Sequence, residues 1–147
     1  MNLLCIVYIV LATLLLCSCY DHEATDLGSA ASTGDMEKVR QLVASGVDVN
    51  GCVGYEGCDR PLASAAAEGQ LEVVKYLVKH GAKINIGRRN AVYEAAHFGK
   101  ADVVHYLLSQ GGRLMCDPGN LTALKRDMTS AGWAKLAAEV EKTWVAP

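Results

Sequence analysis

The chain has 147 residues (15.7 kDa), of which 51% are hydrophobic, and its 14 basic and 16 acidic residues give a net charge of −2. A nucleic-acid-binding protein would carry a marked excess of basic residues, so this balance argues against a nucleic-acid partner. The length suits one domain.

The N-terminal segment is apolar. From Leu3 to Leu16 only Tyr8 and Thr13 interrupt the apolar run, and the first charged residue is Asp21. As a helix these 14 residues would span about 21 Å, short of the roughly 30 Å hydrocarbon core of a bilayer. We therefore expect a signal peptide that directs export. The alternative is an uncleaved membrane anchor, because the stretch from Leu3 to Tyr20 approaches spanning length.

The end of this segment, Leu16-Cys17-Ser18-Cys19, resembles a bacterial lipobox. The resemblance implies a lipoprotein-type signal peptide over residues 1–18, acylation of Cys19, and a tether over residues 19–24 between the lipid and the fold. It also implies the outer membrane, facing the periplasm, because Tyr20 stands where an aspartate would retain the protein in the inner membrane. The alternative is a soluble exported protein that is cleaved nearby.

The chain holds six cysteines, and Cys5 and Cys17 fall within the expected signal peptide. Cys52 and Cys58 share one glycine-rich loop, so in an oxidising compartment we expect a disulfide between them, with two free thiols as the alternative. Cys116 lies far from both in the sequence and is expected to be a free, semi-buried thiol. No histidine lies at a spacing typical of a zinc site, and we expect no metal and no cofactor.

The first helical pair is expected after the tether. Thr25 or Asp26 caps a helix over LGSAAST, and Asp35 caps a second helix after Gly34. Gly46 ends the second helix. Apolar residues recur along that helix at three- and four-residue spacing and make one apolar face: Met36, Val39, Leu42 and Val43.

Two further pairs repeat this pattern. Pro61 suits the first turn of a helix of small residues, LASAAAE, and NAVYEAAHFG is the corresponding helix of the third pair. Gly81 ends the second helix of the second pair, and Gly111 and Gly112 end that of the third. The apolar faces of those second helices are Leu71, Val73, Val74, Leu77 and Val78, and then Val103, Val104, Leu107 and Leu108.

The last segment departs from the pattern. Asp117-Pro118-Gly119-Asn120 is typical of a turn, and the helices LTALKRDMTSAG and WAKLAAEVEK are expected after it. The second of these helices presents one apolar face: Trp133, Leu136, Ala137 and Val140. An apolar inner face with a charged outer side is what a terminal unit of a stack requires.

Glycines recur at steps of 35, 30 and 33 residues, at Gly34, Gly69, Gly99 and Gly132. With RPLASAAAEG, VVKYLVKHGAKIN and NAVYEAAHFG in register, this period resembles the ankyrin-repeat family. The resemblance implies an all-α solenoid of about four helix-turn-helix repeats with β-turn finger loops. We expect the domain over residues 25–147, with repeats at about 25–53, 54–85, 86–116 and 117–147.

Solenoids of this kind present a surface to a partner, and the resemblance implies recognition by fingers and inner helices. On the fingers, the expected protein-binding residues are Tyr55, Glu56, Asp59, Arg88 and Arg89. On the inner helices, they are Ser32, Thr33, Glu68, His97 and Phe98. The alternative for each charged residue is a solvated surface, and for Phe98 it is packing against the last helical pair.

The sequence has no G-x-S-x-G, H-E-x-x-H or glycine-rich phosphate loop, so we assign no catalytic residue and expect no enzyme. Export combined with a binding fold favours an immunity protein that neutralises a secreted toxin, for example a phospholipase of the type VI secretion system. The expected partners are therefore another protein and, through the acyl chains, a membrane. One alternative is a periplasmic ankyrin protein that protects against oxidative stress alongside catalase, and another is a small envelope enzyme.

Overall fold

A computed structural model describes residues 22–51, 60–87, 89–130 and 133–144. Within these ranges the chain is built of helices and connecting loops, which confirms the expected all-α solenoid. None of these helices combines the length and apolarity that crossing a bilayer requires. The helices are α2 (His22–Thr33), α3 (Met36–Ala44), α4 (Pro61–Glu68), α5 (Leu71–Lys79), α6 (Ala91–His97), α7 (Ala101–Ser109), α8 (Pro118–Ser130) and α9 (Ala134–Lys142).

The helices form antiparallel pairs, and a short glycine turn closes each of the first three pairs. Gly34, Gly69 and Gly99 have φ angles of 78°, 79° and 70°, a left-handed conformation that glycine adopts without steric cost. After Gly34, the Asp35 side chain accepts a hydrogen bond from the backbone N–H of Lys38 at 3.0 Å, as the expected cap requires. The recurring glycines therefore mark real turns between an inner and an outer helix.

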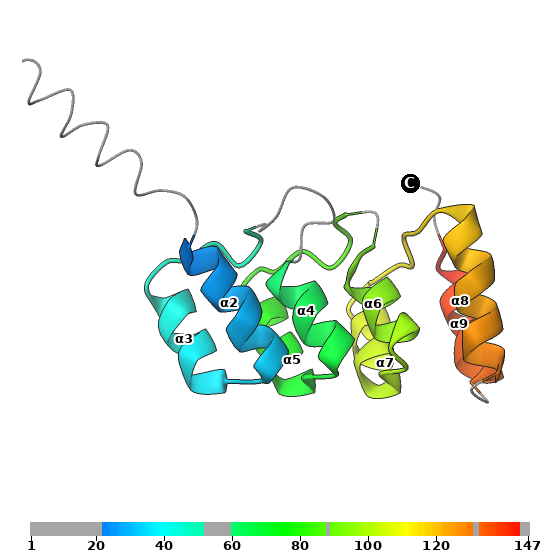
Figure 1. Ribbon diagram of the computed structural model, residues 1–147, viewed down its shortest axis with the longest axis horizontal. Helices are drawn as coiled ribbons and strands as arrows, with labels where there is room; N and C mark the ends of the chain where they lie inside the picture. Colours follow the sequence, from blue (N-terminus) through cyan, green and yellow to red (C-terminus); the bar gives the residue numbers. More distant parts are fainter. Residues whose placement is uncertain (1–21, 52–59, 88, 131–132, 145–147) are drawn as a thin grey trace, which may run out of the picture.

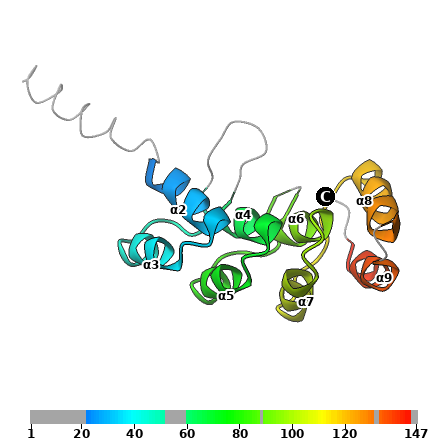
Figure 2. The same cartoon turned by 60° about the horizontal axis from the view of Figure 1, so that its bottom comes forward.

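The pairs stack side by side along the chain (Figure 1). The inner helices α2, α4 and α6 form one row, and the outer helices α3, α5 and α7 form a second row (Figure 2). Each inner helix packs extensively on the next, whereas contact between successive outer helices is sparser. The contact of α8 with α6 is also smaller than that of α6 with α4, and the pair α8–α9 stands farther off in both views. The last unit is therefore the most loosely docked of the four.

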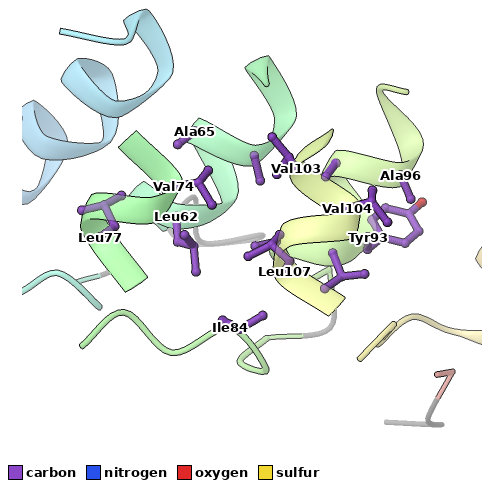
Figure 3. Packing of buried hydrophobic residues seen from close by; sticks show 14 of the residues in the cluster. Leu62, Ala65, Val74, Leu77, Ile84, Tyr93, Ala96, Val103, Val104 and Leu107 are labelled. Carbon is purple, nitrogen blue, oxygen red and sulfur yellow. The ribbon is translucent and has the colours of Figure 1, made fainter. Parts of the chain in front are cut away.

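The core lies between the helices of each pair and between neighbouring pairs (Figure 3). Small residues on α4, such as Ala65 and Ala66, are fully buried and let the inner helices approach closely. Burying each larger apolar side chain contributes about 1.5–3 kcal/mol. The outer helices bury the centre of each apolar face that the sequence predicts: Val39, Val73, Val74, Leu77, Val103, Val104 and Leu107.

Two asparagines clip neighbouring loops together, a feature that the sequence analysis missed. Asn50 donates to the carbonyl of Gly81 at 3.1 Å and accepts from the backbone N–H of Lys83 at 2.8 Å. Asn85 repeats this arrangement one unit later, with Gly111 at 3.0 Å and Arg113 at 2.8 Å. Each asparagine side chain thus makes two hydrogen bonds to the backbone of the next loop, one as donor and one as acceptor.

The structure corrects two expected boundaries. Helix α2 begins at His22, before the expected cap at Thr25 or Asp26. The residues between have good helix propensity and contain no glycine or proline, so the helix extends through them. The expected turn at Asp117–Asn120 is instead the start of α8, because Pro118 suits a first helical turn, and Leu121 donates its backbone N–H to the carbonyl of Asp117 at 3.0 Å.

One expected placement in the last unit also changes. Trp133 lies at the N-cap position of α9 and, as expected, packs against the core with Leu136, Ala137 and Val140. Cys116, expected to be semi-buried, is a free thiol with no solvent exposure. Gly132 and the cysteines Cys52 and Cys58 lie outside the described residues.

Candidate functional site

The exposed side of α2, α4 and α6, here called the inner-helix face, changes character along the stack. Thr33, Glu68 and Phe98 occupy equivalent positions, each directly before a turn glycine, and all three are exposed. The residues before them are Ser32, Ala67 and His97. These two positions are therefore polar or small on the first two inner helices, with Glu68 as the one charged residue, and both carry rings on the third.

Ser32 and Thr33 use their hydroxyl groups within their own helix. The Ser32 hydroxyl donates to the carbonyl of Ser29 at 2.9 Å, and the Thr33 hydroxyl lies 3.0 Å from the same carbonyl. The backbone carbonyl of Ser32 accepts from Nε2 of Gln70 at 3.2 Å, which ties the first turn to the second. Both residues lie on the expected face, but their hydroxyl protons are already engaged.

At the opposite end of the face, Arg89 is held in a fixed position before α6. Its Nε lies 3.0 Å from Oε1 of Glu94, and its Nη2 lies 3.4 Å from Oε2. Its guanidinium carbon stands 5.1 Å from the centre of the Tyr93 ring, which is a cation–π contact. The Arg89 side chain remains 53% exposed, whereas that of Glu94 is 15% exposed. Arg89 is thus oriented by the fold and still accessible.

Aromatic rings continue from Tyr93 along α6. The His97 ring lies 5.8 Å from that of Tyr93 and within 8° of parallel, and the Phe98 ring meets His97 edge-on at 5.0 Å. Tyr93 is 6% exposed, and burial raises the pKa of its phenol, with the guanidinium of Arg89 acting in the opposite direction. Phe98 is 54% exposed, and among the described residues it is the one large hydrophobic side chain that is exposed. These residues form a ladder, Arg89–Tyr93–His97–Phe98, along one side of α6.

Two residues that the sequence analysis did not name complete this arrangement: Tyr93 is part of the ladder, and Glu94 supports it. Arg89, Tyr93 and His97 are spaced four residues apart, which places them on one side of a helix, and this spacing is the signal that was missed. Glu94 follows Tyr93 directly and supplies the carboxylate that orients Arg89.

Several expected site residues lie outside the described part of the chain and stay predictions: Cys19, Tyr55, Glu56, Asp59 and Arg88. The same holds for the expected disulfide between Cys52 and Cys58. Glu68 lies on the inner-helix face as expected, on α4 between Thr33 and Phe98 in register.

Groups that bind metals do not gather in the described ranges: no three His, Cys, Asp or Glu side chains come together there. The Cys116 thiol is enclosed, and burial raises its pKa, while the indole of Trp144 acts in the opposite direction. Trp144 also donates its indole N–H to the carbonyl of Cys116 at 3.1 Å. This thiol therefore supports packing of the last unit rather than surface chemistry.

A family model described as ankyrin repeats (three copies) matches residues 8–88, more than half of the chain. A comparison with curated proteins finds no match. The paired helices, glycine turns and stacked inner row continue beyond the match, through α6 and α7. Ankyrin repeats form protein-interaction modules, and proteins built from them are generally binding scaffolds without catalysis. The chain belongs to the ankyrin-repeat family.

Proposed function

We propose that this protein is an exported, lipid-anchored binding protein of the bacterial envelope that neutralises an antibacterial toxin through its inner-helix face. A phospholipase delivered to the periplasm by a type VI secretion system is the class of toxin that suits it best. A blocker tethered to the membrane would stand beside the lipid that such an enzyme attacks.

The observation that carries the binding role is the ladder on α6, whose two ends, Arg89 and Phe98, are exposed. Phe98 is 54% exposed beside an accessible arginine, and aromatic and arginine side chains are enriched at binding hot spots. Arg89 and Phe98 occupy the two ends of the ladder, so one partner surface could engage both.

The envelope location is supported by the sequence of the N-terminal segment alone. The apolar run from Leu3 to Leu16 and the lipobox-like sequence ending at Cys19 favour export and acylation. Several acyl chains on one residue would anchor the protein firmly, because each buried methylene contributes about 0.8 kcal/mol.

Two experiments test the two halves of the proposal. Labelling with radioactive palmitate should mark the wild-type chain and not Cys19→Ala, and equal labelling of both would reject acylation at this residue.

Expressing the chain in bacteria challenged with candidate envelope toxins should protect the cells, and Phe98→Ala should weaken protection at unchanged protein level. Protection that does not depend on any inner-helix residue would reject the assigned face.

The oxidative-stress alternative receives no support from Cys116. Its thiol has no exposure, and burial raises its pKa, so the reactive thiolate is disfavoured and peroxide has no direct access. Cys52 and Cys58, on which that alternative also depends, lie outside the described residues, so it stays a prediction.

A further inference from the structure

The ladder on α6 also indicates what kind of partner surface fits it. This inference rests on the proposed binding role of the inner-helix face. It uses the two ends of the ladder, Arg89 and Phe98, which differ in chemistry and are both accessible.

Arg89 is preorganised for a second carboxylate. The carboxylate of Glu94 lies along the Nε–Nη2 edge of the guanidinium, at 3.0 and 3.4 Å. A guanidinium has five N–H donors and a second edge, formed by Nη1 and Nη2, that can bind another carboxylate in the same bidentate way. Because Tyr93 and Glu94 already fix the side chain, little rotamer freedom is lost when a partner binds.

Phe98 supplies the apolar end. The edge-on contact with His97 orients its ring, and over half of its surface is left open. Arg89 and Phe98 are nine residues apart, so at about 1.5 Å per residue the two ends of the ladder lie roughly 13 Å from each other along the helix axis.

The remainder of the face limits the shape of the partner. Next to the ladder, α2 and α4 present the small side chains of Ser32 and Ala67. Glu68 is the exception: it is exposed on α4 in the register of Phe98, so the apolar rather than the acidic part of a partner would lie beside it. We propose that the partner presents an extended acidic and apolar segment that places a carboxylate on Arg89 and an apolar side chain on Phe98. At about 3.3 Å per residue, the two partner residues are three or four positions apart.

The test uses the full chain in detergent and a phage-displayed library of random 12-residue peptides. Selected peptides should be enriched in Asp or Glu three or four residues from Leu, Ile, Phe or Trp. Their binding should weaken at least tenfold in Arg89→Gln and in Phe98→Ala, and Arg89→Lys should also weaken it, because an ammonium cannot replace the bidentate fork.

Arg40 provides the matched control. It is an exposed arginine whose guanidinium carbon lies 6.0 Å from the centre of the Tyr76 ring, on the outer helices. Arg40→Gln removes the same charge and the same kind of ring contact away from the inner-helix face, so peptide binding should stay within twofold of wild type. Circular dichroism of all variants checks that the fold is retained.

The inference is wrong if the selected peptides are basic or uncharged, if none is selected, or if Arg89→Gln and Arg40→Gln bind them equally. Photo-cross-linking from position 68, at the middle of the face, tests the proposed function separately. If the captured envelope protein lacks an acidic residue three or four positions from an apolar one at the cross-linked segment, the proposed function stands and this inference is wrong.

Discussion

The indole of Trp133 lies directly over Gly99. A Cβ built on Gly99 would stand 2.8 Å from Cη2 of Trp133, closer than such atoms approach in proteins. Gln70 covers Gly34 and Lys100 covers Gly69 in the same way. Each turn glycine is thus a docking point for the residue that begins the next outer helix, and the last unit uses a tryptophan for this contact.

Gly99→Ala should destabilise the protein more than Gly111→Ala. Both glycines have positive φ angles, 70° and 81°, so alanine at either position costs about 1–2 kcal/mol of backbone strain. Nothing lies within 4 Å of the Cβ position at Gly111, whereas the Cβ at position 99 meets Trp133. We expect an additional loss of about 1 kcal/mol or more for Gly99→Ala, measured by urea unfolding.

A double variant isolates the tryptophan contact. In a Trp133→Ala background, Gly99→Ala should cost about the same as Gly111→Ala. A cost that stays as large as in the wild type would show that Trp133 is not the cause.

The last unit should unfold before the rest of the stack. Both tryptophans of the chain, Trp133 and Trp144, belong to it, and its inner helix α8 packs less extensively on α6 than α6 packs on α4. In a solenoid each unit is stabilised only by its neighbours, so a loosely docked end unit frays first. Tryptophan fluorescence should therefore change at lower urea than far-ultraviolet circular dichroism. Coincident transitions would contradict loose docking.

The pairs and turns were predictable because they depend on local rules. A glycine must stand where φ is positive, and an apolar stripe must face the core, so Gly69 and the face with Val74 and Leu77 could be identified from spacing alone. Helix boundaries were harder, because the same residues suit a turn and a helix start, as Pro118 shows.

The details of the candidate site were less predictable. The contact of Arg89 with Glu94 joins a loop to a helix, and the sequence gives no measure of that distance. The asparagine clips were visible as a repeated signal, since Asn50 and Asn85 end equivalent stretches, GVDVN and GAKIN. Their role could not be predicted, because the carbonyls of Gly81 and Gly111 that they bind come close only when the loops stack.

Asn90→Ala should destabilise the protein by about 2 kcal/mol. Asn90 is 1% exposed, accepts from the backbone N–H of Tyr93 at 3.1 Å and donates to the carbonyl of Arg113 at 2.6 Å. Alanine removes the cap of α6 and leaves the partly buried carbonyl of Arg113 without this donor. Thermal unfolding measures the loss, and Asn120→Ala, an exposed position in α8, should stay within about 0.5 kcal/mol of wild type.

Asn90→Asp separates the two hydrogen bonds. It retains the acceptor for Tyr93 but replaces the donor with a carboxylate oxygen facing the carbonyl of Arg113. It should be at least as unstable as Asn90→Ala, whereas near wild-type stability would mean that only the cap matters.

The Cys116 thiol should make stability depend on alkaline pH. Burial raises its pKa in the folded chain, so the folded protein keeps a proton that the unfolded thiol loses above about pH 8.5. The stabilisation is complete below that pH and is lost as the pH rises through the folded pKa. Between pH 7 and pH 10 the wild type should lose more stability in urea unfolding than Cys116→Ala, and identical pH profiles would contradict an enclosed thiol.

The central claim is that the inner-helix face of this stack binds another protein. The most direct measurement is photo-cross-linking in living cells, with p-benzoylphenylalanine at position 98 and, as a control, at position 75 on α5. The account predicts a discrete protein adduct from position 98 and none from position 75. Adducts from position 75 alone, or none from position 98, would contradict it.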